Sequence, residues 1–382
     1  MVRIAGLSRW GSALPMLGAL ALPACGDGIS LRLGGQNSGT GGSDDGGPPD
    51  NVVPPEDAPP DAPPGCIDPA LLGLLDEVRG YGEATRGGAD GCVYTVENSD
   101  DDGRPGSLRD AVERLEPLWI VFDADYDIAL TAPLLPRSNK TIDGRGRKIT
   151  LRDYPLRIDN QSEIIIESIA FEAPTDEAGL DISKNDHDAI TLLGSGTQNV
   201  WINHCSFSGY ADDHIDLLGA ATFITISWSR FTNQDEMINI GTQPEDDSTR
   251  STRVTMHHNF FNGAQRYHPR LRYGYVHSFN NIVNDWIDWA AGAAAGGQLY
   301  SEANWYIAAR DDQDVFKTNF GSEDATNGFI HSEPTDRIVL EDEASPYDQK
   351  PDMERPIYAK DPLVRPADDE LRWGVGLAAG PR

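Results

Sequence analysis

Three arginines fall within seven residues in the stretch GAQRYHPRLRYG, at Arg266, Arg270 and Arg272. Guanidinium groups bind carboxylates, and His268 lies between the arginines; the ordinary pKa of a histidine is close to neutral, which suits proton transfer. The chain as a whole carries a formal net charge of -30. An anionic ligand needs a local reversal of that charge, so the cluster predicts an anion-binding groove at this part of the chain.

Two acidic clusters precede the arginines. The stretch NDHDAI holds Asp186 and Asp188, and the stretch YADDHIDL holds Asp212, Asp213 and Asp216. Carboxylates gathered this closely repel one another unless a cation neutralises them, and calcium prefers several carboxylate oxygens as ligands. The clusters therefore favour a cation site, and the alternative is a set of solvated aspartates in turns.

Composition narrows the function further. The chain has 61 acidic and 31 basic residues. Nucleic-acid binding depends on Lys and Arg that neutralise phosphates, so this balance argues against a nucleic-acid partner. It allows an acidic polysaccharide, provided that cations or clustered arginines reverse the charge locally. The 382 residues are enough for one large domain or two ordinary ones.

The first 25 residues predict an export signal. Early arginines precede an apolar run from Ala13 to Leu22, which is too short for a permanent membrane span. The following LPAC resembles a bacterial lipobox, which would make Cys25 the acylated first residue of a secreted or outer-membrane-anchored bacterial lipoprotein; an ordinary cleaved signal is the alternative. Residues 26–65 are rich in Gly, Ser, Pro and Asp, so we expect a disordered linker there.

Short β-branched and aromatic runs recur from Trp119 onward, separated by Asp, Asn, Gly and Ser clusters. The last large residues of the runs are Phe171, Phe207, Phe231, Phe261, Val283 and Tyr306. The final intervals, 261 to 283 and 283 to 306, are 22 and 23 residues, and a period near 22 with insertions is typical of a solenoid. In this alignment Asn259, Asn281 and Asn304 occupy one position, which predicts a ladder of stacked amides.

The ends of the folded part, residues 66–382, differ from the repeats. Residues 68–80 and 107–115 have helical patterns, and we expect them to form a short N-terminal helical cap that covers the end of the solenoid. The Pro-rich and acidic tail from Glu333 to Arg382 is expected to be irregular and to lie along the outside.

The cysteines divide into two kinds. Export makes a disulfide possible, and Cys66 with Cys92 is the pair that we expect to form it. Cys205 lies in a strand-like run, and we expect it to be a buried thiol.

Several sequence blocks resemble, in order and spacing, the signature blocks of family 1 pectate lyases, and together they cover residues 80–304. They are GYGEATRGGADGCVYTVENSDDDGRPGSLRDAV, SNKTIDGRG, NVWINHCSF, ITISWSRF, VTMHHNFF and RLRYGYVHSFNNIV. The resemblance implies an all-β fold, a right-handed parallel β-helix with a single-stranded solenoid. It also implies a carbon-oxygen lyase, acting as a monomer, that cleaves α-1,4-polygalacturonate in pectin by calcium-dependent β-elimination.

The resemblance also assigns roles to residues. The family's calcium pattern, a D-x-D pair followed by an acidic-x-x-x-D pair on the next turn, maps onto Asp186, Asp188, Asp212 and Asp216. Its general base is an arginine in the motif R-x-P-x-x-R, which implies Arg266 as the base, Arg272 as the clamp on a substrate carboxylate and Arg270 as a secondary contact. A guanidinium has a pKa above about 12, so it can act as a base only where neighbouring cations favour its neutral form.

The sequence departs from the family pattern at two places. Arg266 lies three residues before Pro269 instead of two, so Tyr267 matches the motif by spacing; a one-residue bulge would return Arg266 to the groove, and His268 is the alternative base. Glu236 stands where many members carry a substrate-binding lysine. Two other functions stay open: a pectin lyase that acts on methylated substrate without calcium, and a non-catalytic polysaccharide-binding β-helix.

Overall fold

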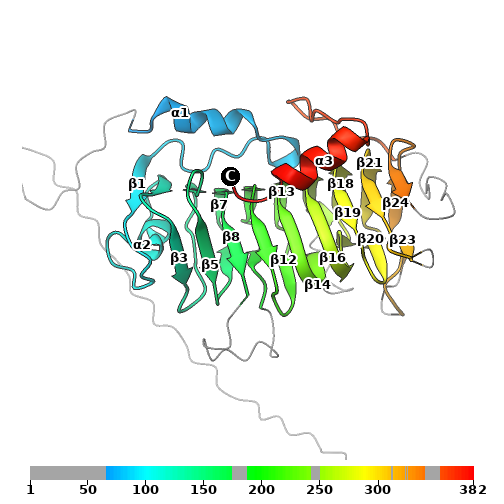
Figure 1. Cartoon of the computed structure of the whole chain (residues 1–382), viewed down its shortest axis with the longest axis horizontal. Helices are drawn as coiled ribbons and strands as arrows, with labels where there is room; N and C mark the ends of the chain where they lie inside the picture. The colour runs from blue at the N-terminus through cyan, green and yellow to red at the C-terminus, as the bar shows by residue number, and fades with distance from the viewer. Residues whose placement is uncertain are drawn as a thin grey trace, which may run out of the picture. The chain divides into compact units, whose positions relative to one another are not determined.

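Short strands rich in isoleucine and valine stack in parallel from one coil to the next (Figure 1). The computed structural model describes residues 66–173, 187–241, 250–310, 313–322, 324, 326–339 and 353–382. In these ranges the named strands pair in parallel, and each coil contributes to three strips of sheet. This arrangement confirms the expected all-β fold, a parallel β-helix.

The first strip is a ten-stranded sheet. Its strands, in spatial order, are β1 (Cys92–Val96), β2 (Leu118–Phe122), β4 (Lys140–Asp143), β7 (Ser162–Glu167), β10 (Gln198–Asn203), β13 (Thr222–Ser227), β15 (Arg253–His257), β18 (Tyr275–Phe279), β21 (Gln298–Glu302) and β24 (Phe329–Ser332). Ile142, Ile166, Ile202 and Ile226 pair in register across neighbouring strands, and each is fully buried. Stacked β-branched side chains thus fill one side of the core.

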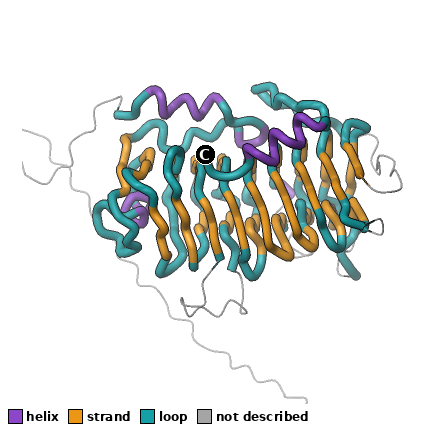
Figure 2. The backbone as a smooth tube through the Cα atoms, viewed as in Figure 1, coloured by secondary structure: helices purple, strands orange, loops and turns teal. Residues whose placement is uncertain are grey.

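The other two strips form one fifteen-stranded sheet, because β14 (Arg230–Ile240) runs through both. One strip contains β3 (Tyr126–Ala129), β5 (Ile149–Arg152), β8 (Ala170–Glu172), β11 (Ser206–Ser208), β14, β16 (Phe260–Arg266), β19 (Ile282–Asn284), β22 (Trp305–Ile307) and β25 (Arg337–Val339). The other, here called the groove strip, contains β6 (Leu156–Asp159), β9 (Ile190–Leu193), β12 (Asp213–Leu218), β14, β17 (Arg270–Arg272), β20 (Trp289–Ala294) and β23 (Asp314–Lys317). Figure 2 shows the loops that join these strands from coil to coil.

The predicted series of large residues forms a single stack inside the coil. Its four phenylalanines have ring centroids 5.1, 4.7 and 4.7 Å apart from one coil to the next: Phe171, Phe207, Phe231 and Phe261. The strand register continues the stack through Val283 to Tyr306. The alignment of repeats in the sequence is therefore confirmed.

The predicted asparagine ladder is also confirmed. Asn281 Oδ1 accepts the backbone N–H and the side-chain amide of Asn259, both at 2.9 Å, and Asn304 Oδ1 accepts the same two groups of Asn281 at 2.8 and 3.1 Å. Asp336 takes the corresponding place on the next coil, where its Oδ1 accepts the backbone N–H of Asn304 at 2.8 Å. The residue before each of the three asparagines has φ between 52° and 55°, so a tight left-handed bend presents the ladder amides to one another.

The first predicted helix is shorter than expected and does not cover the end of the coil. It consists of α1 (Pro69–Leu72) and a 3-10 turn over Gly73–Asp76, and it lies along the outer face of the ten-stranded sheet. There it forms a separate apolar cluster: Ile67, Leu74, Val78, Trp119, Ile165 and Trp201. The reason is that Trp119, Ile165 and Trp201 point outward on three strands, so this face also needs a cover.

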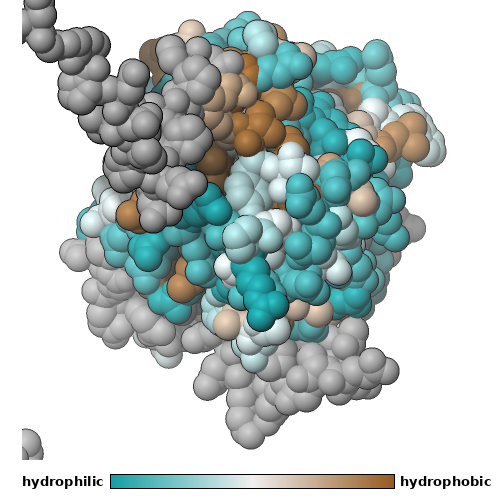
Figure 3. Space-filling model, turned by 90° about the vertical axis from the view of Figure 1, so that its left-hand side faces the viewer, coloured by the Kyte–Doolittle hydropathy of each residue, from teal (hydrophilic) through white to brown (hydrophobic). Residues whose placement is uncertain are grey.

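The second predicted helix does cover the end. Ser107 Oγ accepts the N–H of Asp110 at 3.2 Å at the start of α2 (Leu108–Glu113), and Leu108 and Val112 join the main core. Figure 3 looks onto this end of the coil, where the described surface is mostly hydrophilic, with apolar residues gathered in the upper part of the view. The expected cap is therefore formed by α2 alone.

Both expectations for the cysteines are confirmed. Cys66 and Cys92 form a disulfide that ties the N-terminal arm to β1, and Cys205 is a buried free thiol.

The C-terminal tail is only partly irregular, which corrects the prediction. Helix α3 (Asp369–Ala378) begins at Asp368, whose Oδ1 accepts the N–H of Leu371 at 2.9 Å. Leu371 and Val375 pack against Ile282 and Trp305 on the outside of the coil. Tertiary packing holds this helix together although it contains glycines. In the described part of the chain, the helices are all too short or too polar to cross a membrane.

Candidate active site

On the groove strip, one outward-pointing residue of each strand pairs in register with the corresponding residue of the next strand. In spatial order these positions are Arg157, Thr191, Asp216, Asn239, Arg270, Gly292 and Lys317. The adjacent Ile215, Ile238 and Leu271 point inward and are fully buried. Strand alternation therefore brings two of the predicted residues, Asp216 and Arg270, onto the same floor.

A column of charged side chains runs along one edge of this floor. Asp213, Glu236 and Arg266 are register neighbours on β12, β14 and β16. On one side Asp188 Oδ1 accepts the backbone N–H of Asp213 at 3.1 Å, and on the other Arg266 Nη1 donates to Asp288 Oδ2 at 2.7 Å. We call these five residues the groove column; four of them are acids.

One extra residue lies between Arg266 and Arg270. These two pair with Glu236 and Asn239, so four steps along the chain, 266 to 270, face three steps on β14, 236 to 239. Tyr267 takes up the extra residue with φ of 74°, in the left-handed region. This is the one-residue bulge expected from the altered motif, and it keeps Arg266 on the groove column.

Arg266 is held firmly by acids. Its Nε and Nη2 donate to Glu236 Oε1 at 3.0 and 2.7 Å, and its Nη1 donates to Asp288. Burial lowers the pKa of Arg266, but the hydrogen bonds to Glu236 and Asp288 outweigh burial and raise the pKa above its ordinary value. A general base needs a shift in the opposite direction, so these contacts favour the protonated form.

The structure favours Arg270 over Arg272 as a contact for a substrate carboxylate. The side chain of Arg272 is 3% exposed, and its Nε donates to the buried Asp324 at 2.7 Å. The ring of Phe320 lies near the guanidinium groups of both Arg272 and Arg270, so burial and the bond to Asp324 are what set Arg272 apart. Arg270, in contrast, lies on the floor, where its Nη1 donates to Asn239 Oδ1 at 3.0 Å.

His268 is also placed differently from the prediction. The residue is 1% exposed, and its Nδ1 lies 2.8 Å from the carbonyl oxygen of Ala290. Burial lowers the pKa of His268 to about 4, so the imidazole is neutral at ordinary pH. The ring packs on Phe261 inside the coil, so its position does not favour a contact with substrate or a role as the base.

The predicted calcium ligands are only partly described. Asp186 lies outside the described residues. Asp188 and Asp216 line one pocket of about 550 Å³ on the groove strip, together with Thr191. The hydroxyl of Thr191 donates to Asp188 Oδ2 at 3.1 Å, and the backbone N–H of Asp213 donates to its other oxygen. These carboxylates are oxygen donors of the kind that calcium prefers.

A different set of carboxylates comes closest together. Among the described residues, Asp212, Asp213 and Glu236 are the group whose ligand oxygens all lie within 4.8 Å of one another. Asp213 is 3% exposed, and its Oδ1 is buried without a hydrogen-bond partner. Burial raises the pKa of Asp213 well above its ordinary value, and the surrounding acids, Asp216 and Asp188 first, raise it further. The donor set fits a hard divalent cation such as calcium.

Three residues of this site were misjudged or missed from the sequence. Asp213 was not predicted as a metal ligand, although it lies between predicted ligands. Glu236 was identified only as a residue that replaces the lysine of many family members. Asp288 was missed altogether. It lies 22 residues after Arg266, which is the basal period of the repeat, so that period would have placed it one coil further along.

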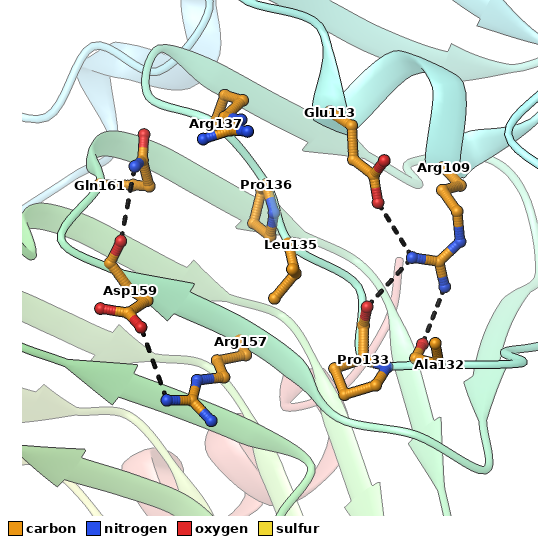
Figure 4. Close-up of a pocket in the computed structure, with 10 residues that line it drawn as sticks. All are labelled: Arg109, Glu113, Ala132, Pro133, Leu135, Pro136, Arg137, Arg157, Asp159 and Gln161. Carbon is orange, nitrogen blue, oxygen red and sulfur yellow. Dashed lines mark hydrogen bonds and ion pairs between the residues drawn. The ribbon is translucent and has the colours of Figure 1, made fainter.

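The groove continues toward the N-terminal coils in a second pocket, of about 640 Å³, which shares Pro133 and Arg157 with the first. Figure 4 shows Arg109 bonded to Glu113 and to two backbone carbonyls, while Arg157 meets Asp159 at 3.5 Å. Arginines thus line the groove on both sides of its acidic centre.

Fold and site define a parallel β-helix with an acidic, arginine-flanked groove. The profile of the family described as Pectate lyase matches residues 129–347, which is 219 of the 382 residues. Because this is more than half of the chain, the protein belongs to the pectate lyase family.

Curated relatives support this family, and solved structures share the fold. Putative pectate lyase 2 of Arabidopsis thaliana is 36% identical over 253 residues, which cover 62% of this chain and 65% of the relative. The chain thus spans less than two thirds of that relative's length. The structure of jun a 1, the major allergen from cedar pollen, is 28% identical with a TM-score of 0.71, over 82% of this chain and 95% of that one. The pectate lyase Bsp165PelA from Bacillus sp. N165, solved in complex with trigalacturonate, shares the fold at 21% identity and a TM-score of 0.62, over 79% and 98% of the two chains.

Proposed function

We propose that this protein is a pectate lyase that cleaves α-1,4-polygalacturonate by calcium-dependent β-elimination, with Arg266 as the general base. Family membership supports the reaction. The observation that carries the residue assignment is the bulge at Tyr267, which keeps Arg266 in register with Glu236 at the edge of the groove despite the altered motif.

The reaction is an elimination and consumes no water. The base removes the proton at C5 of a galacturonate, the electron pair of that bond forms the C4–C5 double bond, and the glycosidic oxygen leaves C4 and takes up a proton. Calcium bound to the uronate carboxylate would make the C5 proton more acidic and stabilise the enolate-like charge. The predicted ligands are Asp186, Asp188, Asp212 and Asp216.

The chain's own residues set the conditions for proton transfer. Glu236 and Asp288 hold Arg266 in its charged form, so these contacts must weaken before Arg266 can accept a proton. Arg270 supports substrate binding, because its guanidinium lies on the floor beside Asn239 and over the ring of Tyr267. We assign it, in place of Arg272, the contact with a uronate carboxylate.

Ultraviolet absorbance tests the activity, because elimination creates a conjugated double bond. The full chain, mixed with polygalacturonate and calcium, should show rising absorbance that a chelator stops. Arg266→Ala should reduce the rate by about 10²–10⁴-fold, the range for loss of a general base. Arg104→Ala, at an arginine that is 84% exposed, is the matched control and should leave the rate unchanged.

The other outcomes separate the alternatives. A signal that grows with methylation and needs no calcium would identify a pectin lyase. A folded, calcium-supplied protein that gives no signal on either substrate would leave a polysaccharide-binding β-helix.

We also propose export, with lipid attachment at Cys25. Both predictions concern residues outside the described ranges. Mass spectrometry of the mature protein would test them, because acylation adds a defined mass to a chain that begins at Cys25.

A further inference from the structure

We propose that Asp212, Asp213 and Glu236 bind a second divalent cation of the calcium class. This site differs from the predicted set of Asp186, Asp188, Asp212 and Asp216, because it adds two carboxylates that this set does not use. The two sites would share Asp212. The second site lies at the edge of the groove, beside Arg266.

The first argument is the geometry of the three carboxylates. Their ligand oxygens lie within 4.8 Å of one another, so one ion could contact all three. Asp213 and Glu236 are held there by the register of β12 and β14, and Gln234 fixes the turn by donating from its side-chain amide to the carbonyl of Asp212. The strand register and this hydrogen bond therefore bring the donors together, as a preorganised site requires.

The second argument is the unpartnered oxygen of Asp213. Asp213 is 3% exposed, and its Oδ1 is buried and accepts no hydrogen bond in the described part of the chain. A buried carboxylate oxygen without a partner is costly, and it is stabilised either by a proton or by a cation. The acids around it favour a cation, because one divalent ion also neutralises Asp212 and Glu236.

Glu236 can serve the cation and Arg266 at the same time. Both hydrogen bonds from Arg266 go to Oε1 of Glu236. The second oxygen of Glu236 accepts none among the described residues, which leaves it for the cation. An ion there would share the Glu236 carboxylate with Arg266, one at each oxygen.

Calcium titration by calorimetry tests the site on the full chain, without substrate. Glu236→Gln and Asp213→Asn should each lower the number of bound calcium ions by one relative to the unchanged chain. Glu236→Lys should do the same, because it places an ammonium group beside Asp213. Asp235→Asn is the matched control: it removes one exposed charge from the same strand and should leave the number of ions unchanged.

Two results would overturn the proposal. An unchanged ion count in both Glu236→Gln and Asp213→Asn, with melting temperatures that show folded protein, would mean that these residues bind no ion. The loss of one bound ion in Asp235→Asn as well would mean that binding depends on the net charge of the region and not on these three carboxylates.

The readout is binding, so this proposal and the proposed function can fail separately. Absence of lyase activity would leave the ion count untouched. Full activity in a chain that binds one ion fewer would leave the pectate lyase intact.

Discussion

Two columns of side chains run along the same solenoid, one position per coil, and they differ in what they carry. The asparagine ladder, Asn259, Asn281 and Asn304, consists of amides that both donate and accept, so each member satisfies the next. The groove column consists mainly of carboxylates, which only accept, together with Arg266. The same stacking geometry therefore stabilises the fold in one place and creates a demand for cations in the other.

The protein should lose stability if a carboxylate, the group that dominates the groove column, replaces an amide of the asparagine ladder. Asn281→Asp replaces an amide donor that bonds Met256 O at 2.9 Å and Asn304 Oδ1 at 3.1 Å by an acceptor, in a residue that is 1% exposed. We expect a loss of about 4 kcal/mol of unfolding free energy at pH 8. Burial raises the folded-state pKa of the new carboxyl above its unfolded value, so the loss should shrink as pH falls through that folded pKa toward the unfolded one.

Urea unfolding at pH 8 and pH 5 measures this effect. Asn284→Asp makes the same charge change on a half-buried side chain in β19. It should lower the free energy of unfolding by less than about 1 kcal/mol. If both variants lose the same stability, the added charge itself is responsible and the ladder carries no special weight.

The groove column should be stabilised by cations, whereas the ladder should not respond to them. Calcium at 10 to 100 times its dissociation constant should add about 1.4–2.7 kcal/mol per bound ion. In calcium buffer, Asp213→Asn should lose the stabilisation that one bound ion contributes. In a chelator the same variant should be more stable than the unchanged chain, because it removes a buried carboxylate from a group of acids. Melting temperatures in both buffers measure this crossover, and a variant that is weaker in both would contradict it.

The end of the ladder offers a smaller test. Asp336 stands where the earlier coils have asparagine, and burial raises its pKa to about 6, although hydrogen bonds from Asn304 and serines oppose this shift. The folded state therefore binds more protons than the unfolded state between about pH 4 and 6, and stability falls as pH rises through that window. Asp336→Asn should be more stable by about 1–2 kcal/mol at pH 8 and nearly unchanged at pH 4.

Chemical unfolding at the two pH values checks this prediction. Equal gains at both would show that the substitution acts through something other than charge.

The sequence predicted the ladder better than the groove for a physical reason. Ladder residues repeat one residue type at one period, and the turn before each is the same, so a single alignment placed Asn259, Asn281 and Asn304 correctly. Groove residues change type from coil to coil. The burial of Arg272 depends on Asp324, 52 residues away in a loop, and no local pattern indicates such a pair.

The same contrast applies to the termini. The cap of α2 was predictable because Ser107 and the apolar positions after it are local signals. Helix α3 was missed because it contains Gly374 and Gly376, and its stability comes from packing on distant strands. Local signals thus located the repeats and one cap, while contacts between distant segments decided the rest.

The smallest predicted effect concerns the acid that closes the groove column. Asp288 is 45% exposed and shares Arg266 with Glu236, so Asp288→Asn should change stability by less than about 1 kcal/mol. Removing this carboxylate lowers the pKa of Arg266, and a base with a lower pKa loses its proton at lower pH. The rise of lyase rate with pH should therefore shift to lower pH, by less than about one unit. Asp285→Asn, at an exposed residue on the same turn, is the control and should leave the dependence of rate on pH unchanged. A shift toward higher pH in Asp288→Asn would show that Arg266 is not the group whose deprotonation sets the rate.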